Sequence, residues 1–301
     1  MRYLIIGSEG FIGKNLVSQL LKNGDEVFGV DILDVFSPGY HYTNCNGDIS
    51  NIEAILKDRS IDSCINAAGN GNLSYALEFP FEDYLMNCKD CFRLLDCIRR
   101  FQPSIHYIHL SSAAVYGNPD SLPIKEDAPK KPISPYGWHK LMAEQVCEEF
   151  VQLYNMSISI LRPFSVYGPG LKKQIIWDLY NKCNTSVDSI ELWGTGNETR
   201  DFIFITDLVH AIDIISKNKL NGLSVYNLAS GHEKKVSDVA EIFVKKFKPA
   251  IEIVFNNAQR QGDPLYWKAD ITKVRDLGFT PATSFEEGIT AYIDWIKQMN
   301  Q

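Results

Sequence analysis

Three side chains in this 301-residue sequence have the types and the order needed to move a proton at a reacting oxygen. Ser112 lies in "HLSSAAVYG", and Tyr136 and Lys140 follow in "SPYGWHK". The spacing of four residues puts Tyr136 and Lys140 on one face of a helix, where an ammonium group can act on a phenol. Pairs of this kind also arise by chance on solvated helices, so their meaning depends on the elements that position them.

The first half of the chain alternates short apolar segments with segments of helical periodicity. Strands are predicted at 2–7, 26–31, 63–69, 106–112 and 157–163, and helices at 13–24, 49–59, 81–101 and 136–154. This alternation predicts an α/β fold of the Rossmann type, a doubly wound parallel sheet with helices on both faces. Ser112 then lies at the carboxyl end of a strand, where ligands bind in open α/β sheets.

The first predicted turn is rich in glycine. In "IIGSEGFIGKNL", Gly7, Gly10 and Gly13 follow one another at intervals of three between a strand and a helix. Gly7 permits the tight turn, Gly10 lets the backbone approach a pyrophosphate, and Gly13 lets the helix pack closely on the strand. The spacing differs by one residue from G-x-G-x-x-G, but the strand–turn–helix context favours a dinucleotide site over a plain turn.

The residues after the next strands indicate which dinucleotide binds. Asp31 ends the second strand and can accept hydrogen bonds from both ribose hydroxyls, while it would repel a 2′-phosphate. No Arg or Lys stands in "VDILDVFSPGY", so we expect NAD rather than NADP. Asp48 can reach the adenine amino group or can cap a helix. Ala67 and Ala68 leave room for a cofactor or pack beneath a neighbouring helix.

With NAD beside them, the three polar residues acquire definite roles. The Lys140 ammonium and the positive nicotinamide both favour the Tyr136 phenolate, whose reference pKa of about 10 is otherwise too high for a base. Tyr136 would then take a proton from a substrate hydroxyl as hydride leaves the same carbon. Ser112 would donate a hydrogen bond to that oxygen. The alternatives are a serine that merely ends a strand and a lysine that is a solvated helix charge.

Taken together, the glycine turn, Asp31, "LSSAAVYG", "SPYGWHK", "LRPFSVYGPG" and "GTGNETRDFIFITDLVHAI" resemble the extended short-chain dehydrogenase/reductase family. The resemblance covers nearly the whole chain and is strongest to the nucleotide-sugar epimerases and dehydratases. It implies an NAD-binding Rossmann domain at 1–165, with 201–231 returning to it. It also implies a smaller mixed α/β C-terminal lobe, formed by 166–200 and 232–301, that binds a nucleoside diphosphate sugar.

The resemblance also assigns site residues. Asn87 matches an asparagine that helps to place the tyrosine and the cofactor, and Arg200 and Arg260 match positions that clasp the diphosphate through the bidentate guanidinium fork. Either arginine could instead form a surface ion pair with Asp201 or Asp263. The expected cofactor-binding residues are Gly7, Gly10, Phe11, Ile12, Gly13, Asp31, Asp48, Ile49, Ala67, Ala68, Asn87, Ser111, Tyr136, Lys140 and Pro163. The expected substrate-binding residues are Ser112, Ser165, Arg200 and Arg260.

Departures from the family pattern narrow the reaction. Dehydratases carry Asp-Glu after the Ser or Thr, whereas this chain has Ala113 and Ala114, so no carboxylate stands there to remove water. Ser165 stands where epimerases often carry an Asn that touches the substrate. The segment "NAAGNGNLSYA", which forms the loop over the sugar, also departs from the usual pattern. These two changes leave the identity of the sugar open.

Composition excludes several other classes of protein. The net charge of −7 gives no support for nucleic-acid or anionic-membrane partners, and no apolar run has the length of a membrane span. The N-terminus reads as a strand rather than a signal peptide, so we expect a cytoplasmic protein. Cys88, Cys91 and Cys97 lack a second ligand pair at a spacing typical of zinc sites. They are predicted to be buried free thiols, and no metal site is predicted.

The sequence therefore favours an NAD-dependent epimerase of nucleotide sugars, acting at C4 through a transient 4-keto intermediate. One alternative is an NAD(P)H-dependent reductase of 4-keto-deoxysugar nucleotides, although Asp31 argues against NADPH. An alternative of another class is a non-catalytic NAD-binding regulator. The resemblance further implies a homodimer through helices 81–101 and 136–154.

Overall fold

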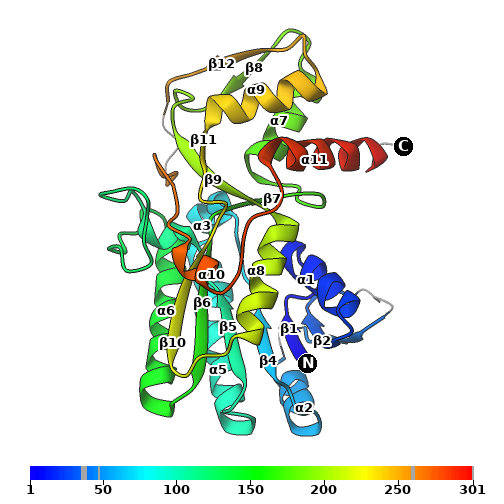
Figure 1. Ribbon diagram of the computed structural model, residues 1–301, viewed down its shortest axis with the longest axis vertical. Coiled ribbons are helices and arrows are strands. Elements are labelled where there is room, and N and C mark those ends of the chain that lie inside the picture. The colour runs from blue at the N-terminus through cyan, green and yellow to red at the C-terminus, as the bar shows by residue number, and fades with distance from the viewer. Residues whose placement is uncertain (35–38, 47, 259–261, 300–301) are drawn as a thin grey trace.

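A seven-stranded, fully parallel sheet forms the centre of the molecule (Figure 1). The computed structural model describes residues 1–34, 39–46, 48–258 and 262–299. The strand order is β10-β6-β5-β4-β1-β2-β3. The strands are β1 (Arg2–Ile6), β2 (Glu26–Asp31), β3 (His41–Asn44), β4 (Ser63–Asn66), β5 (His106–Leu110), β6 (Ser157–Pro163) and β10 (Leu223–Leu228). The Rossmann-type α/β fold is confirmed, with two strands, β3 and β10, that were not predicted as strands.

Apolar side chains cover both faces of this sheet because successive residues of a strand point to opposite sides. In β1, Tyr3 and Ile5 belong to one hydrophobic cluster while Leu4, between them, belongs to the other. Tyr107 and Ile108 of β5 divide in the same way. Each strand therefore needs a layer of helices on either side, as expected for a buried parallel sheet.

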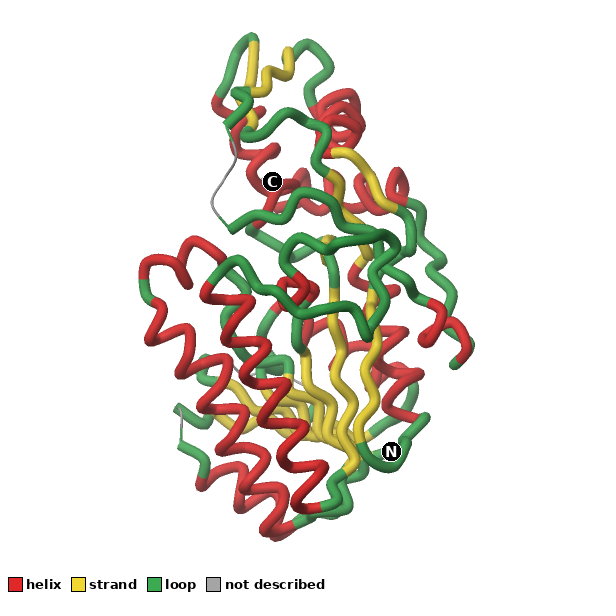
Figure 2. The backbone as a smooth tube through the Cα atoms, turned by 90° about the vertical axis from the view of Figure 1, so that its left-hand side faces the viewer, coloured by secondary structure: helices red, strands yellow, loops and turns green. Residues whose placement is uncertain are grey.

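Two groups of helices supply those layers. On one face, α1 (Phe11–Lys22) packs against α8 (Ile205–Lys217). On the other, α2 (Ser50–Asp58), α5 (Asp90–Phe101) and α6 (Pro135–Tyr154) enclose the second cluster. Figure 2 shows long helices lying side by side across the sheet.

The predicted helix 81–101 is interrupted in the structure. It consists of α4 (Pro80–Tyr84), a π-helical turn η1 (Leu85–Lys89) and α5, and the short helix α3 (Leu73–Glu78) precedes it. Such π-helical turns cannot be read from apolar periodicity, and they are frequent at functional sites. Asn87, one of the expected site residues, lies in this turn.

A smaller lobe stands at the carboxyl edge of the sheet (Figure 1). Its strands are β7 (Ser165–Tyr167), β8 (Ser189–Leu192), β9 (Thr199–Phe204), β11 (Glu233–Lys235) and β12 (Glu252–Phe255), which form a β11-β9-β7 sheet and a β12-β8 pair. Its helices are α7 (Gln174–Thr185), α9 (Val236–Phe247) and α11 (Phe285–Met299), whereas the short helix α10 (Thr272–Asp276) lies against β10 of the large sheet (Figure 1). The chain returns to the large sheet through α8 and β10 between visits to this lobe. The domain boundaries themselves stay a prediction.

The cysteines of the helical layer lie inside the protein. Cys88, Cys91 and Cys97 are buried and unbridged, which confirms the predicted free thiols. The outer faces of α4, η1, α5 and α6 instead carry exposed apolar side chains: Phe81, Tyr84, Met86, Phe92, Trp138, Met142, Leu153 and Tyr154. Within the described ranges, no helix combines the length and apolarity that crossing a membrane would require.

Candidate active site

The glycine turn has the geometry that a dinucleotide cradle needs. Gly7 has a φ of +79°, which disfavours any residue with a Cβ. A Cβ on Gly13 would lie 2.0 Å from the Gly7 carbonyl oxygen, so α1 can approach β1 only through a glycine. Gly10, the N-cap of α1, is exposed and has ordinary dihedral angles. The residue roles therefore differ: Gly7 and Gly13 shape the turn, and Gly10 leaves its surface open to a phosphate.

Asp31 and Asp48 are both engaged by neighbouring backbone groups. Asp31 accepts hydrogen bonds from the amides of Glu9 (2.9 Å), Ile32 (2.7 Å) and Leu33 (3.2 Å). These contacts fix the carboxylate beside the glycine turn, where a ribose would lie. Asp48 accepts from the amide and hydroxyl of Ser50, at 2.9 and 2.7 Å, and these bonds lower its pKa. Of its two expected roles, the structure therefore displays the helix-initiating one.

Ser112, Tyr136 and Lys140 meet at the carboxyl edge of the sheet. Ser112 follows β5 and accepts a hydrogen bond from the Ala114 amide (3.1 Å), which starts the 3₁₀ turn η2 (Ala113–Tyr116). Tyr136 stands in the first turn of α6, whose N-cap Ser134 accepts from the Gly137 amide. The Lys140 ammonium donates to the Leu110 carbonyl (2.9 Å) and lies 6.0 Å from the centre of the Tyr136 ring.

Burial acts on the two titratable groups in opposite directions. Burial raises the pKa of Tyr136 to about 12, although a hydrogen bond with Ser112 acts to lower it. Burial lowers the pKa of Lys140 from 10.5 to about 8. Both shifts favour the neutral form, as desolvation requires. Without NAD, burial has the largest effect on the Tyr136 pKa; that Lys140 and a bound nicotinamide together favour the phenolate stays a prediction.

A buried polar network that the sequence did not reveal supports this site. Asp83 is fully buried; it accepts from Asn87 (3.0 Å) and Asn70 (2.7 Å) and contacts His139 Nδ1 at 2.5 Å. These bonds fix the side-chain amide of Asn87. Its Oδ1 has no hydrogen-bond partner among the described residues and would lie 2.5 Å from a Cβ built on Gly69. The same Cβ would lie 3.4 Å from the Lys140 ammonium nitrogen. Asn87 thus points to the place where β4 ends and Lys140 arrives.

A second buried polar network includes Tyr116, the last residue of the η2 turn. Arg162 is 2 % exposed and donates to both oxygens of Glu144, at 2.9 and 2.7 Å, and to the hydroxyl of Tyr116. Ser111 donates to Glu144 Oε1 at 2.6 Å. The Ser111 hydroxyl is therefore directed into the protein and holds the strand end that precedes Ser112. The expected contact of Ser111 with the cofactor stays a prediction.

The smaller lobe carries two cations that are candidates for binding an anionic ligand. Arg200 of β9 donates to the carbonyls of Thr199 and Leu265 and lies 5.9 Å from the ring centre of Trp267. Asp201 does not pair with it, because Asp201 accepts hydrogen bonds from Ser230, Gly231 and Ala269. Arg260 lies outside the described residues.

Lys173 is the second cation, and sequence reasoning missed it. Its ammonium nitrogen would lie 3.2 Å from a Cβ on Gly71, in the loop expected over the sugar, and its charge acts on Lys140. Desolvation lowers its pKa, and no carboxylate of the described ranges forms an ion pair with it. An ammonium in this position suits an anionic ligand.

The remaining expected residues surround the glycine turn and the sheet edge. Ala68 lies against the glycine turn, since a Cβ on Gly7 would be 2.7 Å from the Ala68 nitrogen. Ser165 is half-buried at the start of β7. The other positions range from half-buried to buried: Phe11, Ile12, Ile49, Ala67 and Pro163. The glycine cradle, the fixed Asp31 carboxylate and the Lys140 ammonium are the features into which an NAD molecule fits.

Comparisons with known proteins agree with this geometry. The model of the NAD dependent epimerase/dehydratase family matches residues 3–229. The chain is 28 % identical to the UDP-glucuronate 4-epimerase of Thermodesulfobacterium geofontis, over 98 % of this chain and 96 % of that protein.

Solved structures show the same likeness. A crystal structure of UDP-glucuronic acid 4-epimerase from Bacillus cereus, with UDP-glucuronic acid and NAD, has a TM-score of 0.89 at 27 % identity, covering 99 % of this chain and 100 % of that one. MoeE5 in complex with UDP-glucose and NAD has a TM-score of 0.87 at 27 % identity, with all of both chains covered.

Proposed function

The chain belongs to the NAD dependent epimerase/dehydratase family, and on that basis we propose that it is an NAD-dependent C4 epimerase of nucleoside diphosphate sugars. The observation that carries the proposal is the convergence of Ser112, Tyr136 and Lys140 beside the glycine turn, together with two alanines after Ser112. Ala113 and Ala114 supply no acid or base, so the site can oxidise and reduce but has no group there to expel water.

The residues divide the reaction between them. Tyr136 takes the proton of the sugar hydroxyl and later returns it, and Ser112 donates a hydrogen bond to the same oxygen. Lys140 and Asn87 hold the nicotinamide side of the cleft, and Asp31 holds the adenosine ribose. NAD, when bound, supplies the site that accepts the hydride and gives it back. Because the hydride returns, the cofactor is not consumed.

The cations of the smaller lobe support an anionic substrate. Arg200 makes no ion pair with a carboxylate in the part of the chain that the structure describes, so its guanidinium is available to the diphosphate. Arg260 is proposed for the same group on the strength of the family pattern. We take UDP sugars as the first substrates to test, since the relatives named above act on or bind them.

The test is isomerisation without added cofactor. The purified full chain is incubated with UDP-glucose, UDP-glucuronic acid and UDP-N-acetylglucosamine, and the C4 epimers are separated by chromatography. A substrate deuterated at C4 should give a product that keeps the deuterium, because the same hydride returns. Oxidation of added NAD(P)H in the presence of a 4-keto-deoxysugar nucleotide, with no isomerisation of the three sugars, would replace the epimerase by a reductase.

Tyr136→Phe provides the matched variant. Removal of one hydroxyl should lower kcat by ~10²–10⁴-fold, the usual contribution of a positioned acid–base group, while NAD binding is retained. Tyr84→Phe, at a half-exposed position on α4, is the control and should keep wild-type turnover. If Tyr136→Phe retains full activity, Tyr136 is not the base, and the non-catalytic regulator becomes the better description.

A further inference from the structure

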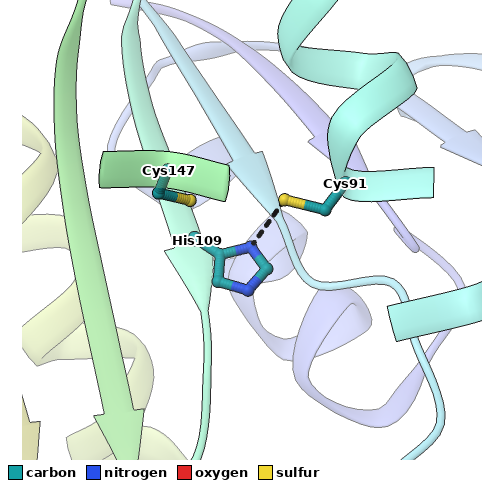
Figure 3. Close-up of side chains that lie close together, drawn as sticks. All are labelled: Cys91, His109 and Cys147. Carbon is teal, nitrogen blue, oxygen red and sulfur yellow. Dashed lines mark hydrogen bonds between the residues drawn. The ribbon is translucent and has the colours of Figure 1, made fainter. Parts of the chain in front are cut away.

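Two buried cysteines and a histidine from three separate elements meet behind the catalytic lysine. Cys91 comes from α5, Cys147 from α6 and His109 from β5, and all three are at most 2 % exposed (Figure 3). One donor atom from each, two Sγ atoms and a ring nitrogen, lie within 4.8 Å of one another. Nothing in the sequence predicts the cluster, because its members are 18 and 38 residues apart along the chain.

The imidazole of His109 is poorly satisfied where it lies. Its Nδ1 has only long contacts, 3.7 Å to Cys91 Sγ and 3.4 Å to the hydroxyl of Tyr107. Its Nε2 is buried and has no hydrogen-bond partner among the described residues. A buried polar group without a good partner costs about 1–3 kcal/mol, so a ligand on either ring nitrogen would replace a weak or missing contact.

The separations are close to those of a closed metal site. A thiolate binds zinc at about 2.3 Å and an imidazole nitrogen at about 2.0–2.1 Å, which places neighbouring donors ~3.5–4 Å apart. The observed atoms therefore need to move by ~1 Å or less.

We propose that Cys91, His109 and Cys147 bind a thiophilic d¹⁰ cation, Cu(I) or Zn(II), which links α5 and α6 to the central sheet. Two thiolates and an imidazole are the donor set that soft cations prefer over Mg²⁺, Ca²⁺ or Mn²⁺. Three donors suffice for Cu(I), whereas Zn(II) would recruit a fourth. The Tyr107 hydroxyl is the nearest candidate, at 3.5 Å from Cys91 Sγ.

The charge balance of the cluster is compatible with this site. Both cysteines bind a cation as thiolates, so loading releases their two thiol protons to solvent, and the two negative charges offset the charge of the cation. The buried position means that the ion would enter while the chain folds.

The test is the metal content of the full chain expressed in medium supplemented with copper or zinc and purified without oxygen. Cys45, the one cysteine that is not buried, is replaced by Ser in every sample to remove adventitious binding. We expect one ion per chain by mass spectrometry, together with thiolate-to-metal charge-transfer absorption in the ultraviolet. A folded chain that carries no ion after growth in either metal overturns the proposal.

Variants then locate the ion. Cys91→Ser and Cys147→Ser should lose it or bind it at least ~100-fold more weakly, whereas Cys183→Ser, at a buried thiol of α7, should retain it. Retention by both cluster variants would overturn the proposal. If the variants do not fold, the unfolding midpoint of the metal-loaded parent against that of the metal-free parent decides, because a bound ion must raise it. A metal-free chain lighter by two hydrogens would identify a Cys91–Cys147 disulfide and would overturn the metal site.

Discussion

Tyr136 and Lys140, the residues proposed to move the proton, are also residues whose charged forms burial disfavours. The pKa of Tyr136 is raised to about 12 and that of Lys140 is lowered to about 8. A phenol with a pKa of about 12 stays protonated at neutral pH, so it cannot accept the proton of a substrate hydroxyl. The positive charge of a bound nicotinamide favours the phenolate and so lowers the Tyr136 pKa. The site is therefore adapted to the loaded protein rather than to the empty one.

Lys140 should cost the protein stability at neutral pH. Its folded pKa of about 8 lies below the reference value of 10.5, so the unfolded chain binds more protons between these values, and stability rises with pH across that window. Below pH 8 the full penalty is present, at most about 3 kcal/mol for this shift.

Lys140→Met should thus raise the unfolding free energy by ~1–3 kcal/mol at pH 7 in urea titrations, with turnover lost. The gain should fade as the pH approaches 10.5. Lys22→Met, on the exposed end of α1, is the control and should show no such dependence. A variant that is less stable than the parent at pH 7 would mean that the hydrogen bond to Leu110 outweighs the burial of the charge.

At the scale of single elements, the glycine turn separates folding from cofactor binding. Gly13→Ala brings a Cβ to 2.0 Å from a backbone oxygen and should lower the unfolding free energy by ~2 kcal/mol or more. Gly10→Ala places its Cβ 3.3 Å from the same oxygen and replaces a favourable N-cap residue, so it should lower the unfolding free energy by only ~0.5–1 kcal/mol, while NAD binding weakens. Urea unfolding and calorimetric titration with NAD measure the two effects. Equal NAD affinity in Gly10→Ala and parent would contradict the role given to Gly10.

The Glu144–Arg162 pair joins α6 to β6 and should be intolerant of single changes. Both side chains are 2 % exposed, so Glu144→Leu leaves a buried guanidinium unpaired and should cost ~3–5 kcal/mol in urea unfolding. The double variant with Arg162→Met should recover much of that loss. Asp96→Ala breaks half-exposed pairs with Arg99 and Arg100 and should cost less than ~1 kcal/mol. Equal losses in Glu144→Leu and Asp96→Ala would show that burial is not the deciding factor.

Local patterns in the sequence predicted the parts of this molecule that local patterns determine. The strand at 26–31 and the helix at 136–154 follow from local patterns and agree with β2 and α6 to within a residue. Periodicity could not predict the π-helical turn, because its apolar spacing is that of an ordinary helix. Nor could it predict contacts between distant segments. Asp83 with His139, and Glu144 with Arg162, meet only after the sheet is assembled.

At the scale of the whole molecule, the layer that holds Tyr136 also has an apolar outer surface. Phe92 of α5 is 42 % exposed and Met142 of α6 is 38 % exposed, in a row with Phe81, Trp138 and Leu153. Large exposed apolar side chains gathered on one layer of a protein often mark a surface that binds another protein. We expect a second copy of the chain to cover this surface, with the two α5–α6 pairs in contact.

Phe92→Glu and Met142→Glu should convert the dimer to single chains, because each places a charge in the apolar centre of the interface. Light scattering coupled to size-exclusion chromatography measures the mass of the particle. Val187→Glu is the matched control, since Val187 is 79 % exposed, lies between α7 and β8 in the smaller lobe, and should leave the mass unchanged. If the parent itself elutes as a single chain at micromolar concentration, the helical surface is not a dimer interface and another partner must cover it. Because Tyr136 and Lys140 lie on the same α6, loss of the dimer should also lower turnover.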